Sequence, residues 1–142
     1  MGTQTLLSQQ VERGTATLRA LDAAGLKIEA ALWVFDESSH RWQFTVADAA
    51  VDREGTRALY ERMIPALKRA QNTLPVSEIY AVSPNVSLVA LVRKTVTTGP
   101  NAVDNIWSTG DVVEGTVLPD MLIHRMSAAR GASATEKLRG GS

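Results

Sequence analysis

The stretch from Trp33 to Trp42, WVFDESSHRW, holds the densest group of reactive side chains in this 142-residue chain. Asp36 and His40 are of types that bind metal ions, and His40 could also act as a general base on a neighbouring serine hydroxyl. The same five residues, 36–40, are polar turn formers between two apolar runs, and adjacent solvated side chains lack the buried partner that orients a triad or a metal shell. We therefore predict a hairpin bend here, with a catalytic role as the alternative.

Asp120 and His124 are the other candidates for chemistry. Pro119-Asp120 opens like a nuclease pattern that continues with an acid, any residue and a lysine, but Glu136 is followed directly by Lys137. Alternation along the last strand would place His124 on one face with Leu122 and Met126, which favours a buried imidazole over a catalytic one. A metal-dependent hydrolase or nuclease is thus the alternative function, with a site assembled from Asp36, His40, Asp120 and His124.

Other reaction motifs are missing from the sequence. There are no cysteines, which removes thiolate metal sites and cysteine nucleophiles. The chain contains neither of the glycine-rich phosphate-binding patterns, G-x-x-x-x-G-K and G-x-G-x-x-G, and no G-x-S-x-G elbow. We therefore expect no cofactor and no resident metal, and a protein without catalysis of its own.

Composition narrows the class of partner. Fifteen Lys and Arg balance fifteen Asp and Glu, so no net field attracts nucleic acid, and a nucleic-acid partner is not expected. No stretch approaches the ~20 apolar residues of a membrane span, and the first residues lack the apolar core of a signal peptide. With no cysteine to form disulfides, we expect a soluble, cytoplasmic protein with no membrane partner.

Helical spacing of apolar residues predicts two helices. The first covers residues 5–24 and is weakened at Gly14, and the second covers residues 53–72 and is kinked or divided at Pro65. The segment 86–96 is ambiguous, since its β-branched residues favour a strand while its apolar spacing and the preceding asparagine suit a helix. We expect the helix.

Strand patterns fill the rest of the chain. Apolar and alternating runs predict a hairpin over 28–47, a strand over 77–83, and two C-terminal strands within 103–126, with Pro119 at a bulge or an edge. Together the elements predict one α+β domain over residues 1–126, a largely antiparallel sheet of about five strands with the helices packed on it.

Residues 127–142 form a basic tail rich in Gly, Ala and Ser, which we expect to be mobile. Its end, Leu138-Arg139-Gly140-Gly141, resembles the tail of ubiquitin-like modifiers. That resemblance implies conjugation through Gly141 after removal of Ser142. A Gly-Gly-Ser end is also typical of a cloning linker.

The aromatic residues give the leading hypothesis. If the strand that begins at Ile28 alternates, Trp33 and Phe35 share one face, and Trp107 could join them. This aromatic face is either buried under the N-terminal helix or packed on a second copy or another protein. We therefore predict a small accessory or interaction protein that associates with a protein partner, or with itself, through its sheet, with Trp33, Phe35 and Trp107 as binding residues.

Overall fold

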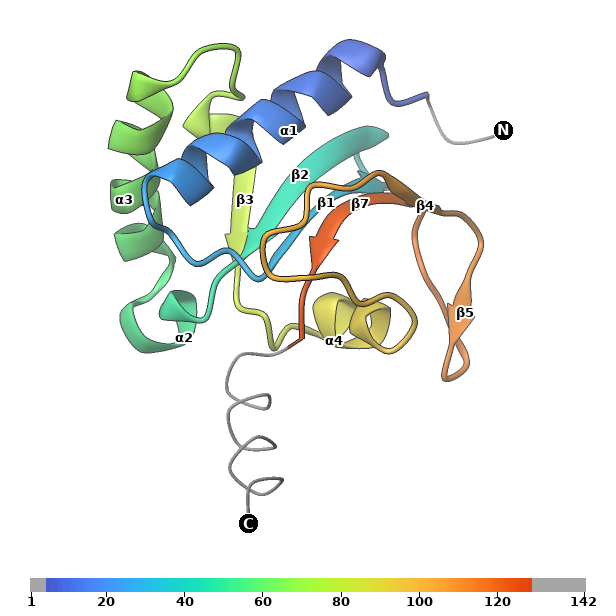
Figure 1. Ribbon diagram of the computed structural model, residues 1–142. Coiled ribbons are helices and arrows are strands. Elements are labelled where there is room, and N and C mark those ends of the chain that lie inside the picture. The colour runs from blue at the N-terminus through green and yellow to red at the C-terminus, as the bar shows by residue number, and fades with distance from the viewer. Residues whose placement is uncertain (1–4, 129–142) are drawn as a thin grey trace.

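A computed structural model describes residues 5–128 and confirms an α+β fold (Figure 1). The helices and strands, in chain order, are α1 (Ser8–Ala23), β1 (Ala30–Asp36), β2 (Arg41–Ala47), α2 (Ala50–Glu54), α3 (Thr56–Arg69), the 3-10 turn η1 (Val76–Glu78), β3 (Ile79–Val82), α4 (Ser87–Arg93), β4 (Ile106–Ser108), β5 (Val112–Val113), β6 (Thr116–Val117) and β7 (Met121–Met126). None of the helices in this part of the chain is long and apolar enough to cross a bilayer.

The main sheet has five strands in the order β3-β2-β1-β7-β4. Three of its pairs are antiparallel, but β2 and β3 run parallel, so the prediction of a largely antiparallel sheet was wrong in this respect. The reason is the connection, since α2 and α3 carry the chain from the end of β2 back to its start, and a helical crossover joins parallel strands. The short strands β5 and β6 pair only with each other.

Each face of the sheet has its own apolar cluster. Trp33 and Phe44 belong to the cluster under α1 and α3, whereas Leu32 and Val34 belong to the cluster under α4. The near-continuous apolar run of β1 is explained by this double cover, because successive side chains point to opposite faces and both faces are buried. Figure 1 shows α1 crossing the sheet on one side and α4 lying below it.

The helical predictions hold with two corrections. Helix α1 runs unbroken through Gly14, and α3 runs unbroken through Pro65. The second predicted helix is divided instead at Gly55, which has φ of 85° and separates α2 from α3. A glycine tolerates this left-handed region, whereas a residue with a Cβ is strained there. The ambiguous segment 86–96 contains α4, as expected.

The C-terminal strands differ from the expected pair. A turn with positive φ at Glu114 and Gly115 folds β5 onto β6, so the second predicted strand is split and Pro119 lies between β6 and β7. The irregularity assigned to Pro119 occurs at His124 instead, where the register of β7 against β1 shifts. Strands β5 and β6 have only two residues each, which is too short for an alternating apolar pattern to predict them.

The outer edge of β3 is closed by a side chain. The Tyr60 hydroxyl on α3 donates to the Ile79 carbonyl oxygen (2.8 Å) and accepts from the Ala81 amide (3.0 Å). These two backbone groups are therefore already satisfied, and an incoming strand would have to displace Tyr60 to pair with them.

Candidate binding groove and aromatic strip

The segment 36–40 is a bend, as predicted. The Asp36 carboxylate accepts hydrogen bonds from the Ser38 hydroxyl (2.9 Å) and the Ser39 hydroxyl (2.8 Å), and His40 closes the turn with φ of 55°. These hydroxyls, Ser39 first and then Ser38, lower the pKa of Asp36 below its ordinary value. The hydroxyls thus act as donors that hold a carboxylate, and the His40 ring lies edge-on to Phe35 with centroids 6.2 Å apart.

The four candidate metal ligands do not meet. Across residues 5–128, no group of three or more His, Asp or Glu side chains is placed to hold a metal ion. Asp36 and His40 lie at the hairpin bend, while His124 lies further along β7 against Phe44. The backbone oxygen of Asp120 accepts from the Phe35 amide at 3.0 Å, which brings Asp120 to the hairpin end of β1 without completing a ligand set.

His124 is fully buried beneath the helical layer. Its Nδ1 is 2.6 Å from the Asp104 carbonyl oxygen, and its Nε2 is buried with no hydrogen-bond partner among the described residues. Burial lowers the pKa of His124, opposed in part by the contact with Asp104. The predicted face was wrong in part, because the register shift at His124 leaves Met126 in the cluster on the other side of the sheet from Leu122.

The predicted aromatic residues lie on one face of the sheet, but to different depths. Trp33 pairs with Phe44 on β2 and with Leu122 on β7, and Leu122 pairs in turn with Trp107. Directly paired residues point to the same face. Trp33 is 3% exposed and Phe35 is also buried, whereas Trp107 on the edge strand β4 is 55% exposed.

Gly14 explains how Trp33 is covered. A Cβ at Gly14 would stand 2.6 Å from Trp33 Nε1 and 3.0 Å from Phe44 Cε1, so α1 can rest on these rings only because residue 14 has no side chain. The sequence pattern suggested that this glycine weakens the helix, but its role is close packing. The Trp33 Nε1 is buried there, with no hydrogen-bond partner in the part of the chain that the structure describes.

Beside the first turns of α1 the aromatic face emerges as a strip. We call Phe35, Trp42 and Trp107 the aromatic strip. The Trp42 ring is 5.4 Å from Phe35 and 6.2 Å from Trp107 between centroids, both edge-to-face. Such contacts fix the orientation of the rings, so Trp107 is presented to solvent on a packed support.

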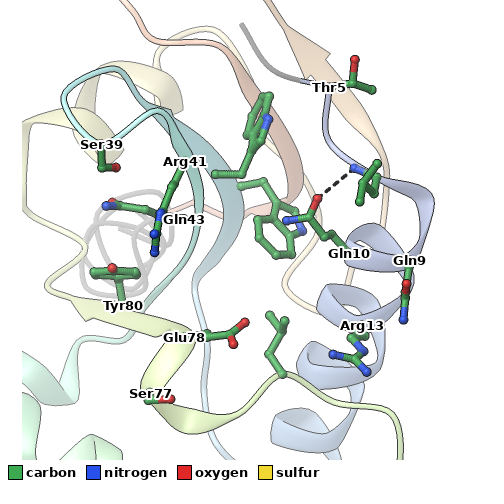
Figure 2. Close-up of a pocket in the computed structure, with 14 residues that line it drawn as sticks. Thr5, Gln9, Gln10, Arg13, Ser39, Arg41, Gln43, Ser77, Glu78 and Tyr80 are labelled. Atoms are coloured by element: carbon green, nitrogen blue, oxygen red, sulfur yellow. Dashed lines mark hydrogen bonds between the residues drawn. The ribbon is translucent and has the colours of Figure 1, made fainter.

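An open groove runs beside the aromatic strip. It lies between the first turns of α1, the start of β2 and the segment η1–β3, and its volume is about 1030 Å³ (Figure 2). We call it the α1–β3 groove. Trp33 and Trp42 supply indole surface to it, and the polar side chains that line it include Gln10, Arg13, Arg41, Glu78 and Tyr80. The groove joins the aromatic strip at Trp42.

The α1–β3 groove presents more donors than acceptors. Arg13 on α1 and Arg41 on β2 contribute two positive charges, and Glu78 on η1 contributes one negative charge. Gln10 already uses its Oε1 to accept from the Leu7 amide at 2.9 Å, and the Gln43 amide nitrogen donates to Asp36 at 3.3 Å. The arginines and the Tyr80 hydroxyl are therefore the groups best placed to contact an occupant.

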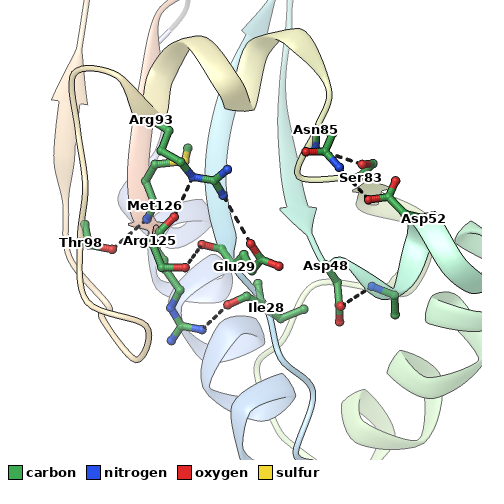
Figure 3. Close-up of polar contacts among 12 residues, drawn as sticks. Ile28, Glu29, Asp48, Asp52, Ser83, Asn85, Arg93, Thr98, Arg125 and Met126 are labelled. Carbon is green, nitrogen blue, oxygen red and sulfur yellow. Dashed lines mark hydrogen bonds and ion pairs between the residues drawn. The ribbon is translucent and has the colours of Figure 1, made fainter. Parts of the chain in front are cut away.

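A second polar cluster, on the other side of the molecule, is structural. Arg125, 1% exposed, donates to both Asp22 oxygens (2.9 and 2.7 Å) and to the Ile28 and Ala102 carbonyl oxygens. Figure 3 shows it beside Arg93, which donates to the Ser127 carbonyl oxygen at 2.8 Å and lies 3.6 Å from Glu29. These contacts tie strand ends and α1 together and leave little of the charge accessible.

Sequence reasoning missed most of the groove. Trp42, Arg13, Arg41 and Tyr80 were not predicted as site residues. One signal for Trp42 was present, because a hairpin with a four-residue turn places it opposite Phe35 and hence on the same face. The groove itself depends on how α1 crosses the sheet, which no local pattern reports. The tail motif ending in Gly141 lies outside the described residues.

Comparison of the chain with protein-family models, with curated proteins and with solved structures found no match.

Proposed function

We propose that this is a non-catalytic binding protein that holds an extended segment of a partner protein in the α1–β3 groove and across the aromatic strip. The observation that carries the proposal is the exposed Trp107, supported edge-on by Trp42 at the mouth of the groove. Tryptophan, tyrosine and arginine are the residues most enriched among those that dominate binding energy at protein interfaces, and all three occur here.

The shape of the site favours a peptide segment over a small molecule. A volume of about 1030 Å³ is at the upper end for small-molecule pockets, which enclose most of their ligand. This groove is open to solvent, so a compact ligand would stay largely in water. An extended segment could follow it from Tyr80, on the α4 face of the sheet, around the start of β2 to Trp42 and Trp107 on the other face. The closed edge at β3 implies that the segment binds through its side chains rather than by adding a strand.

The test is selection from a random peptide library displayed on phage, followed by titration of a synthetic selected peptide. We expect Trp107→Ala and Tyr80→Ala each to weaken binding about tenfold, in line with the loss of a central interface aromatic. Both side chains are exposed, at 55% and 46%, so the variants should fold. Val86→Ala, at an exposed apolar residue before α4, is the matched control and should bind as the parent does.

A second copy of the chain is the other occupant that the sheet hypothesis allows. Sedimentation equilibrium between about 5 and 500 µM separates the two. A monomer mass with peptide binding supports the proposal, while a dimer that Trp107→Ala dissociates would assign the strip to self-association. A library that yields no peptide above background would contradict the proposal.

A further inference from the structure

Two arginine side chains in the α1–β3 groove have no carboxylate partner in the described part of the chain. No ion pair joins Arg13 or Arg41 to an acid there, as is also true of Arg19, Arg53 and Arg69 outside the groove. The Arg13 Nε is buried and has no hydrogen-bond partner within residues 5–128. A buried guanidinium N–H without an acceptor destabilises the folded state, so this end of the groove favours an occupant that supplies a hydrogen-bond acceptor.

The carboxylate that faces Arg41 is already occupied. Asp36 and Arg41 are opposite each other at the end of the hairpin, but the Asp36 oxygens accept from Ser38, Ser39 and Gln43 instead. Those donors satisfy the acid within the bend. Arg41 is consequently left exposed at the groove wall, with its guanidinium available to an occupant.

Glu78 is the one acidic side chain that lines the groove, and it restricts where an anion can sit. It is exposed on η1, just before β3, and forms no ion pair with either arginine among the described residues. Figure 2 shows the Arg13 and Arg41 side chains on different sides of β2, with Glu78 between them in the view, because Arg41 points to the α4 face of the sheet and α1 covers the other face. A segment that meets both arginines therefore passes around the start of β2. An acidic side chain of the occupant would be attracted by each arginine and repelled by Glu78.

We propose that the segment bound in the α1–β3 groove is acidic, with aspartate or glutamate side chains meeting Arg13 and Arg41 while apolar residues of the segment pack on Trp42 and Trp107. This rests on the proposed function. A guanidinium binds a carboxylate through two parallel N–H···O bonds, which gives direction as well as charge. The net charge of the lining, two arginines against one glutamate, complements such a segment.

The experiment uses the selected peptide and its amide counterpart, in which each Asp is replaced by Asn and each Glu by Gln. We expect selected peptides to be enriched in acidic residues, the amide counterpart to bind about tenfold more weakly, and Arg41→Gln and Arg13→Gln each to weaken the acidic peptide by about tenfold. Glu78→Gln should strengthen it severalfold. Far-UV circular dichroism checks the fold, and Arg41, which is exposed, gives the variant least coupled to packing.

Arg57→Gln is the charge-matched control. Arg57 lies on α3 outside the groove, with its side chain 91% exposed, and its loss lowers the net charge by the same amount. We expect less than about a twofold effect, because exposed distant charges are screened by salt. Selection of neutral or basic peptides whose binding Arg41→Gln leaves unchanged would overturn the acidic assignment while the proposed function stands. Failure to select any peptide would overturn both.

Discussion

Replacing Gly14 by alanine tests how α1 covers the sheet. The new Cβ would lie 2.6 Å from Trp33 Nε1 and 3.0 Å from Phe44 Cε1, against an optimal separation of about 3.5–4.0 Å for such atoms. The indole is 3% exposed and packed on Phe44 at 5.1 Å, so neither ring can retreat by about 1 Å without disturbing the core. Overpacking of this kind costs about 1–3 kcal/mol, and the clash places Gly14→Ala near the upper figure.

Helix propensity acts in the opposite direction. Alanine is favoured over glycine inside a helix by about 1 kcal/mol, so the net loss of unfolding free energy should be about 2 kcal/mol. For a chain of this size that corresponds to a fall in melting temperature of about 4–8 °C. Urea unfolding followed by far-UV circular dichroism measures it. Thr15→Ala, the next residue of α1, is the control for propensity alone and should change stability by less than about 0.7 kcal/mol.

A double-mutant cycle identifies the contact responsible. Phenylalanine at position 33 lacks the indole nitrogen Nε1 and the ring fusion to which Trp33 Cε2 belongs, the two places on the indole that the new Cβ would approach. Gly14→Ala should therefore cost less in a Trp33→Phe background, with a coupling of about 1–2 kcal/mol. If Gly14→Ala leaves the free energy of unfolding unchanged or raises it, the close packing of α1 on Trp33 is refuted.

Two further predictions concern buried charge. Because the pKa of His124 is lowered in the folded chain, the unfolded chain binds the proton more readily, so the stability from this residue is present above about pH 6.5 and is lost as pH falls below it. The free energy of unfolding from urea titrations at several pH values should fall by at most about 1.4 kcal/mol per pH unit from this source. His124→Asn, which keeps a donor for the Asp104 carbonyl, should remove that slope, and an unchanged slope would refute the assignment. Asp22→Ala leaves Arg125 buried without its carboxylate and should lower the free energy of unfolding by about 3 kcal/mol, the lower end for a broken buried pair because the Asp22 side chain is 31% exposed. Glu61→Ala, in the exposed pair with Arg57, should lower it by less than about 1 kcal/mol. Equal losses in the two variants would contradict the account.

The sequence predicted those parts of the fold that depend on local pattern. The hairpin bend at 36–40 follows from polar turn formers between alternating runs, and the helix at 86–96 follows from apolar spacing. The helix predicted between the second and third strands is typical of a parallel connection, and β2 and β3 are indeed parallel. The prediction of an antiparallel sheet followed the hairpin that comes before this helix. The bulge at His124 has no local signature, because it depends on pairing with β1.

The binding site was less predictable than the fold. Trp33, Phe35 and Trp107 do share one face, yet only the three-dimensional arrangement shows that Trp107, beside the first turns of α1, stays exposed on the edge strand while the other two are buried. Arg13 and Arg41 lie 28 positions apart in the sequence, on a helix and a strand whose crossing brings them to one groove. The spacing of residues within one helix or strand does not predict which side chains of different elements come together. Isolated surface arginines are also too common in sequences to be selected as site residues.

Backbone and indole NMR signals of the ¹⁵N-labelled protein, titrated with a selected acidic peptide, test the central claim most directly. The three tryptophans give three indole N–H signals. Binding in the α1–β3 groove and across the aromatic strip predicts saturable shifts of the Trp42 and Trp107 indole signals and of the Gln10 and Tyr80 amides, with the Val89 and Val92 amides of α4 unmoved on the opposite face. Shifts centred on α4, or none that saturate, would contradict the account.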